Sequence, residues 1–222
     1  MKKKNKLKRA LPSGPHDLSR EAVESSQRDR LLEAMAESVA EKGFAHTAVA
    51  EVIARSGVSR ATFYTQFANK EECFSATFTA ASQRIREAMV KEMETSMGGS
   101  ESNKEKSPSQ KLERIVTAYL DTLVSNPAFA RTFLVEVYAG GPAVIERRLH
   151  SQQLFADIIC ETHKGESGPL GTKPNQRFAA EILVNAVSGM TTNLVATGNF
   201  EKIKEIKAPV IQFIQEFLSQ DP

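Results

Sequence analysis

The stretch from Thr47 to Phe67, TAVAEVIARSGVSRATFYTQF, constrains the fold of this chain more than any other segment. Its apolar residues recur at helical spacing on both sides of Gly57, in two runs of barely two turns each. A glycine suits the point where a chain leaves one helix and turns toward the next. We therefore expect two short helices, capped by Thr47 and Ser59, that cross at a large angle through a tight turn.

The remaining chain shows the same helical periodicity, and no run alternates in the manner of a β-strand. Glycines, prolines and capping residues divide the pattern into a first helix from Ser26 to Gly43, a long fourth helix beginning at Lys70, and five more between Pro108 and Leu218. Pro209 should kink or restart the last of these. The sequence thus predicts an all-α fold of about nine helices, in which three form a small head and the others a larger bundle.

Positive charge is concentrated at the N-terminal end of the chain. Residues 1–70 hold 13 basic and 8 acidic residues, a net charge of +5, whereas residues 71–222 hold 16 and 19, a net charge of −3. Such an asymmetry favours contact with a polyanion, which releases counterions on binding. We expect a basic flexible arm over residues 1–24, a DNA-binding head over 25–70 and a ligand-binding and dimerisation domain over 71–222. A basic tail that only improves solubility remains the alternative for the first nine residues.

The short helix after Gly57 has one apolar side and one polar side. Val52, Ile53, Val58, Phe63 and Phe67 fasten the two short helices to the first helix. The opposite face then carries Arg60, Ala61, Thr62, Tyr64, Thr65 and Gln66, and no acidic residue lies between Glu51 and Glu71. Such a face fits the DNA major groove, where Arg, Gln and Thr can read base edges. A helical corner inside an ordinary bundle would share the glycine and the apolar spacing.

The segment GFAHTAVAEVIARSGVSRATFYTQFANKEECF, residues 43–74, resembles the DNA-binding head of the TetR family of bacterial regulators. The shared features lie in register over about the first 80 residues. The resemblance implies that the DNA contacts are Thr47, Ser59, Arg60, Ala61, Thr62, Tyr64, Gln66 and Lys70, with Thr47 and Lys70 on phosphates. Two residues depart from the pattern, since many members have Gly at position 61 and His at position 66. Base preference is therefore expected to differ from that of a typical member.

The resemblance also implies a homodimer, in which the eighth and ninth helices of two copies form a four-helix interface. One recognition helix reads only a few base pairs, so two heads on a palindromic operator of double-stranded DNA are expected. Gly189 and Ala186 suit close packing there, and Ile203, Ile206, Val210, Phe213 and Phe217 give the ninth helix an apolar face. The expected function is a transcriptional repressor that a small, largely apolar effector releases from DNA.

Candidate effector contacts lie in the larger domain. They are its aromatic residues, a methionine and two amides on an apolar helix: Tyr119, Phe129, Phe133, Phe155, Asn185, Met190 and Asn193. Aromatic and thioether side chains suit an apolar pocket, and a buried amide needs a partner. A plain core would use the same aromatics, and a subunit interface would satisfy the amides equally well.

Other functional classes find little support in the sequence. The four histidines and two cysteines, Cys73 and Cys160, show no metal-ligand spacing, and no phosphate loop or nucleophile motif is present. We therefore expect no metal, no cofactor and no enzyme activity. No signal peptide or run of 18 apolar residues occurs, which predicts a cytoplasmic protein. A helical enzyme or an interaction module without specific DNA binding remains the alternative, although Arg60, Thr62 and Gln66 favour DNA.

Overall fold

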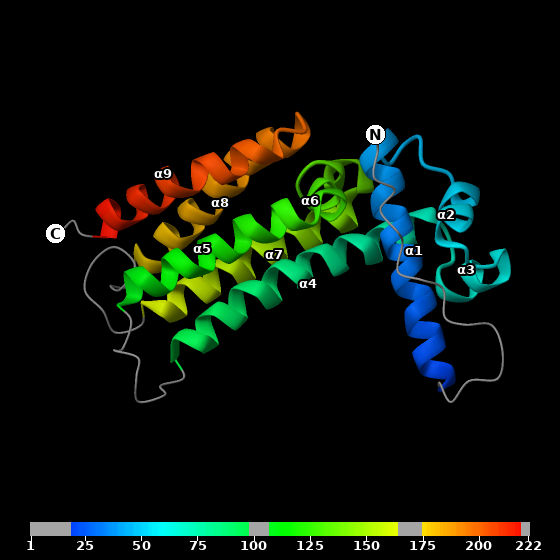
Figure 1. Cartoon of the computed structure of the whole chain (residues 1–222), viewed down its shortest axis with the longest axis horizontal. Coiled ribbons are helices and arrows are strands. Elements are labelled where there is room, and N and C mark those ends of the chain that lie inside the picture. Colours follow the sequence, from blue (N-terminus) through cyan, green and yellow to red (C-terminus); the bar gives the residue numbers. More distant parts are fainter. Residues whose placement is uncertain (1–18, 98–106, 164–174, 219–222) are drawn as a thin grey trace.

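The computed structural model describes residues 19–97, 107–163 and 175–218, and its described part is helical without strands (Figure 1). This confirms the expected all-α fold. The elements are α1 (Arg20–Lys42), α2 (Val49–Ser56), α3 (Arg60–Gln66), α4 (Lys70–Met97), α5 (Pro108–Ser125), α6 (Pro127–Leu134), the 3-10 helix η1 (Glu136–Gly140), α7 (Pro142–Thr162), α8 (Asn175–Ala196) and α9 (Phe200–Leu218). The basic segment before residue 19 lies outside the described residues.

The first helix begins six residues earlier than the sequence pattern indicates. Ser19 caps α1 by accepting a hydrogen bond from the amide of Ala22 (3.2 Å), and Glu21 lies in the first turn, where negative charge is favourable. The expected arm over residues 1–24 is therefore wrong at its C-terminal end, because residues 20–24 are helical. Apolar periodicity missed this turn because it is exposed and carries no core residue.

The helix-turn-helix follows the expected path with one difference at its start. Gly57 adopts the left-handed conformation (φ 62°) at the end of α2, and Ser59 caps α3 by accepting from the amide of Thr62. The cap position of α2 is Ala48, not Thr47, and it has no side-chain hydrogen bond. The hydroxyl of Thr47 instead donates to the carbonyl of Gly43 (2.9 Å), so the expected cap is wrong.

The long helix α4 connects the head to the rest of the molecule. Asn69 caps it, accepting from the amide of Glu72 (2.8 Å), and its 28 residues extend about 40 Å. Figure 1 shows α4 running from the head along the body, while α8 and α9 lie on the opposite side of the body. The next helix, α5, begins with a capping box of Ser107 and Gln110. One continuous hydrophobic core joins the head to the body.

Two irregular features depart from the expected helices. The sixth helix ends at Leu134, and the chain continues as a 3-10 helix, η1, and not as an α-helix. Pro209 lies inside α9 without interrupting it. Pro209 and Glu205, four residues earlier, are both exposed, so water can reach the carbonyl that lacks an amide partner.

One helix of the described part, Gln176–Ala196 within α8, is long and apolar enough to cross a membrane by length and composition alone. Core helices of proteins outside membranes meet the same criterion. About two fifths of this window is buried inside the protomer (39%), and the rest includes exposed Phe178, Ile182 and Met190. These side chains therefore need a covering surface of some kind.

Candidate nucleic-acid interface and effector cavity

The polar side of α3 points away from the molecule, as the sequence predicts. Phe63 and Phe67 are buried in the core, with their ring centroids 5.8 Å apart, whereas Tyr64 is 46% exposed. The ring of Tyr64 leans edge-on against Phe63 at 5.2 Å, which fixes its direction. The α3 face therefore carries a rigidly held aromatic hydroxyl at its surface.

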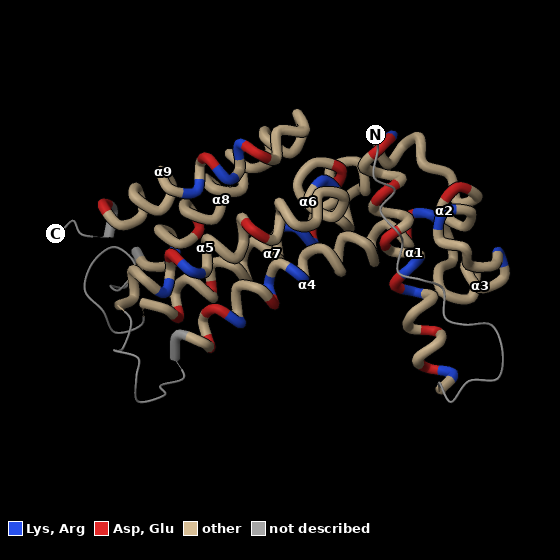
Figure 2. Tube along the Cα trace, viewed as in Figure 1, with Lys and Arg blue, Asp and Glu red and all other residues tan. Residues whose placement is uncertain are grey.

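The exposed α3 face combines one cation with small polar groups. The guanidinium of Arg60 lies 5.5 Å from the centre of the Tyr64 ring, and the hydroxyls of Ser59 and Thr62 are 2.9 Å apart. Ala61 is exposed between them. The charge colouring of Figure 2 shows a cation and no acid on α3. An anionic groove of DNA would thus meet donors and no repelling carboxylate on this face.

The last residue of α3 has a partner within the protein that sequence reasoning missed. Arg28 of α1 donates to both the side-chain oxygen (3.2 Å) and the carbonyl (3.4 Å) of Gln66. Its guanidinium also lies 4.5 Å from the centre of the Phe67 ring. Gln66 is consequently half-buried and oriented by α1, with its amide nitrogen left to donate. No residue spacing in the sequence signals this contact, because the two partners are 38 residues apart.

The two expected phosphate contacts lie close to one loop, the segment between α1 and α2. Thr47 is buried there, with its hydroxyl donating to Gly43. Lys70, at the start of α4, donates to the carbonyl of Phe44 (3.1 Å), and its ammonium lies 4.4 Å from the centre of that ring. Lys70 is thus held at the edge of the loop with donors to spare, whereas Thr47 is positioned mainly as a structural residue.

A cluster of acids behind the recognition face is neutralised internally. Arg55 of α2 pairs with Glu37, Glu41 and Glu51. Its hydrogen bonds to Glu41 and Glu37, and their negative charges, raise its pKa above the ordinary arginine value despite partial burial. These three acidic side chains of α1 and α2 are therefore engaged by Arg55.

Phe44 also receives a contact from the body of the molecule. The carboxylate of Glu136, in η1, accepts a hydrogen bond from the amide of Phe44 (3.0 Å) and pairs with Arg131 of α6 (3.3 Å). The ring of Phe44 packs against Phe74 of α4, with centroids 4.3 Å apart. The loop between α1 and α2, whose Phe44 carbonyl accepts from Lys70, is therefore held by α6, η1 and α4 together. Glu136 showed no signal in the sequence.

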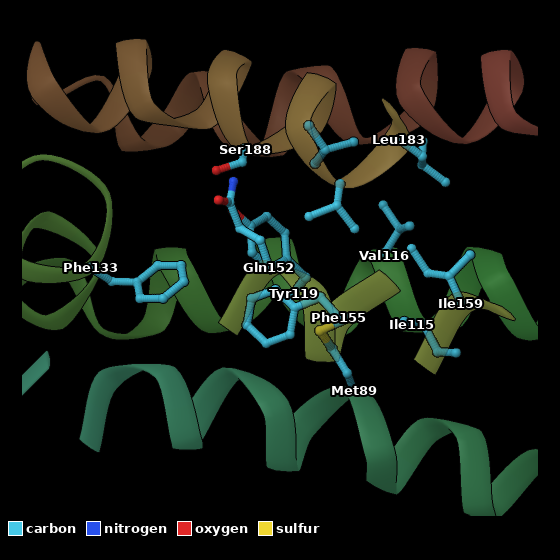
Figure 3. Close-up of a pocket in the computed structure, with 12 residues that line it drawn as sticks. Met89, Ile115, Val116, Tyr119, Phe133, Gln152, Phe155, Ile159, Leu183 and Ser188 are labelled. Atoms are coloured by element: carbon cyan, nitrogen blue, oxygen red, sulfur yellow. The ribbon is translucent and has the colours of Figure 1, made fainter. Parts of the chain in front are cut away.

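A narrow cavity lies in the body and is lined by residues of α4, α5, α6, α7 and α8 (Figure 3). Its volume is about 30 Å³, and its lining is mostly apolar: Met89, Ile115, Val116, Tyr119, Phe133, Gln152, Phe155, Ile159, Leu183, Val184, Val187 and Ser188. Three of the expected effector contacts, Tyr119, Phe133 and Phe155, are brought together here. At this volume the cavity holds about one water molecule, so a larger guest requires the helices or side chains to move.

The other four expected contacts do not line this cavity. Phe129 is buried beneath the guanidinium of Arg84, 3.7 Å from its ring centre. Asn185 is exposed and accepts from Gln152, which does line the cavity (3.0 Å). Met190 and Asn193 lie on the exposed side of α8. Helical periodicity could not assign these faces, because α8 is apolar on nearly all sides.

Within the described residues, no group of three or more histidine, cysteine, aspartate or glutamate side chains is placed to hold a metal ion. Burial raises the pKa of the Cys73 thiol to about 12, and it also raises that of Cys160. The two thiols therefore stay protonated near neutral pH and resemble small core residues more than nucleophiles.

The fold and the exposed α3 face define a class of protein, the helix-turn-helix transcriptional regulators. Within that class, residues 31–77 match the model of the family described as bacterial regulatory proteins, tetR family. The head of this chain thus matches the TetR family model, which confirms the resemblance found in its sequence. No curated protein matches the sequence significantly.

Solved structures of similar fold cover nearly the whole molecule. The fatty acid degradation regulator FadR from Bacillus halodurans is 19% identical with a TM-score of 0.70, over 85% of this chain and 94% of that one. FadR from Bacillus subtilis in complex with stearoyl-CoA is 15% identical with a TM-score of 0.69, over 86% and 97%. A TetR-family regulator from Marinobacter aquaeolei VT8 is 22% identical with a TM-score of 0.65, over 87% and 96%. At these identities the likeness establishes the fold.

Proposed function

We propose that this protein is a homodimeric, cytoplasmic repressor that binds a palindromic operator and leaves it when a small, largely apolar effector occupies the body. The observation that carries the proposal is the exposed, acid-free face of α3, held by Phe63 and Phe67 beside Lys70. In this proposal residues 25–70 are the DNA-binding domain, and residues 71–222 are the domain for effector binding and dimerisation.

The roles of the DNA contacts follow from where their side chains lie. Arg60, Thr62, Tyr64 and Gln66 face outward or are half-buried at the α3 surface, and they read bases together with Ser59 and Ala61 at the helix start. Lys70 positions the backbone of the DNA. Thr47 contributes by shaping the loop before α2, since its hydroxyl is already bonded to Gly43.

The exposed apolar side of α8 supports dimerisation through α8 and α9. Phe178, Ile182 and Met190 are exposed on α8, Ala186 and Gly189 lie between them, and Phe213 is 61% exposed on α9. A contiguous patch of this kind on a protein surface marks an interaction site. The expected apolar face of α9 is divided, however. Ile203 and Val210 are buried in the core of the protomer, whereas Phe213 is largely exposed.

The cavity lined by α4, α5, α6, α7 and α8 supports the effector proposal. Its lining is apolar and aromatic, and α4, which carries Met89 of that lining, starts at Lys70 beside the DNA. The B. subtilis regulator of similar fold binds stearoyl-CoA, an acyl compound, which agrees with an apolar effector. Because the cavity holds so little, an effector must part α4 from α7 or α8. A small tilt of a helix about 40 Å long then displaces the head by several ångströms.

The experiment begins with selection of bound sequences from a random DNA duplex pool. We expect a palindrome with half-sites about 34 Å apart. Arg60→Ala should change the selected bases, at a cost of about 1–3 kcal/mol on the original site. Lys70→Ala should weaken all sequences alike and reduce the salt slope by about one unit. Equal binding of random and selected duplexes by the wild-type protein would contradict the proposal and favour a module without specific DNA binding.

The effector part is tested separately, by screening apolar compounds for a rise in melting temperature and titrating each hit against protein bound to operator. We expect 5- to 150-fold weaker operator binding, with the same factor for effector binding when operator is present. A saturable hit that leaves operator affinity unchanged would reject release by an effector while the DNA-binding function stands.

A further inference from the structure

Arg148, in the middle of α7, is a buried cation with no acidic partner among the described residues. The residue is only 6% exposed. Its guanidinium donates to the carbonyl of Phe133 (2.8 Å) and to the hydroxyl of Ser188 (3.0 Å), both neutral acceptors. It also lies 5.4 Å from the centre of the Phe133 ring. A buried charge is costly unless it is paired, so a guanidinium in this position is ready to accept an anion.

This cation lies directly behind one end of the effector cavity. Ser188, which accepts from Arg148, lines the cavity, and so does Phe133. The hydroxyl of Tyr119 is 3.2 Å from that of Thr191. Burial raises the pKa of Tyr119, and the positive charge of Arg148 partly opposes that effect, so the two groups interact. The polar atoms of the cavity wall are thus within the field of Arg148.

The opposite end of the cavity is apolar. In Figure 3, Ser188 and Gln152 present their polar atoms at one end, next to Phe133, whereas Val116, Ile115, Ile159 and Leu183 gather at the other end. A ligand that matches these two ends has an apolar chain and a single polar terminus. The terminus would lie against Ser188, with Arg148 immediately behind it.

We propose that the effector is an aliphatic chain ending in a free carboxylate, and that the carboxylate binds Arg148 and Ser188. This inference rests on the proposed function and specifies its ligand class. A carboxylate offers two acceptor oxygens to the parallel N–H groups of a guanidinium, which an alcohol or an ester cannot match. On binding, it competes with the carbonyl of Phe133, near the end of α6, for the same donors.

A coenzyme A thioester, the ligand of the B. subtilis regulator, is a different chemistry at this position. Its acyl carbonyl is neutral, and its phosphates lie many bonds away from the chain. A thioester would therefore gain little from Arg148. The two ligand types predict opposite responses to removal of this charge, which makes them separable by one series of probes.

The test compares dodecanoate, dodecanol, methyl dodecanoate and dodecanoyl coenzyme A for binding to the full-length protein by titration calorimetry. Variants are Arg148→Gln, Arg148→Lys and, as a matched control, Arg147→Gln, which removes the same charge from an exposed position of the same helix. The readout is the ratio of acid to alcohol affinity within each variant, because that ratio is insensitive to any loss of stability.

We expect wild-type protein and Arg147→Gln to prefer dodecanoate over dodecanol by about 10- to 100-fold, in line with a hydrogen-bonded charge pair. Arg148→Gln should abolish the preference, and Arg148→Lys should restore part of it. Equal affinities of the wild-type protein for dodecanoate and dodecanol would overturn the carboxylate assignment. So would thioester binding that is tighter than dodecanoate binding and unaffected by Arg148→Gln. Either result would leave the proposal of an apolar effector standing. Failure of all four probes to bind saturably would count against both this inference and the apolar effector.

Discussion

At the scale of single residues, the adjacent Phe63 and Tyr64 of α3 have different roles, one in the core and one at the surface. Phe63 is fully buried, whereas almost half of Tyr64 is exposed. Phe63→Ala should destabilise the protein by about 3–5 kcal/mol, because it leaves a cavity in the core. Tyr64→Phe should change stability by no more than about 0.5 kcal/mol and weaken operator binding. Chemical denaturation and operator titration of both variants measure this, and the reverse order of stabilities would reject the facing of α3.

Cys73 predicts a pH dependence of stability. Burial raises the pKa of its thiol from 9.0 to about 12 in the folded protein. Between these values the unfolded chain releases the proton while the folded chain retains it, so stability falls as the pH rises, by up to about 1.4 kcal/mol per pH unit. Denaturation of wild type and Cys73→Ala at pH 8 to 10.5 should give a steeper fall for wild type. Parallel curves would show that this thiol does not contribute.

At the scale of elements, η1 supplies a polar contact between body and head. Glu136 of η1 accepts from the amide of Phe44 and pairs with Arg131, and Phe44 in turn holds Lys70. We expect Glu136→Ala to cost about 1–3 kcal/mol of stability, since it leaves the Phe44 amide without its acceptor. Glu136→Gln keeps an oxygen acceptor and should cost less. Denaturation curves compare the two.

The same variants test whether this contact transmits the effector signal. If the η1 contact carries the coupling, Glu136→Ala should reduce the factor by which the effector weakens operator binding. The variant should still bind the effector and the operator separately. An unchanged coupling factor in Glu136→Ala, measured with an effector found by screening, would place the transmission in α4 or α6, the helices that pack against α1.

At the scale of the whole molecule, the exposed apolar side of α8 predicts a dimer that can be separated without unfolding. Phe178 and Ile182 are 66% and 54% exposed in the protomer. Phe178→Glu with Ile182→Glu should give a folded monomer, because charges buried in a subunit interface are strongly unfavourable. Analytical ultracentrifugation and circular dichroism measure this, with exposed Lys204→Glu on α9 as a control. A helical protein that remains dimeric would assign the interface elsewhere.

Loss of the dimer should also weaken operator binding, since a single head forms only half of the contacts. The monomeric variant should keep weak, salt-dependent DNA affinity through Arg60 and Lys70, because the two substituted residues lie on α8 and not in the head. Operator affinity equal to that of wild type would mean that one head is sufficient for recognition.

The sequence by itself determined the features that depend on neighbouring residues. Helix caps such as Ser59, Asn69 and Ser107 bond to amides only three residues away, and the left-handed Gly57 ends its helix locally. Such features can therefore be recognised from the sequence. The amphipathic pattern of α3 placed Phe63 inward and Tyr64 outward for the same reason. Together with the family pattern, these features predicted the head almost completely.

Tertiary structure alone decided what depends on partners distant in sequence. Arg28 orients Gln66 across 38 residues, and Glu136 holds Phe44 across 92. The cavity wall combines five helices, so helical periodicity could find Tyr119, Phe133 and Phe155 yet could not separate them from Phe129 or Met190. Arg148 looked like any solvated charge in the sequence. Only the packing of α6, α7 and α8 around it buries the guanidinium beside Ser188, because side-chain burial is a property of neighbouring elements and not of residue order.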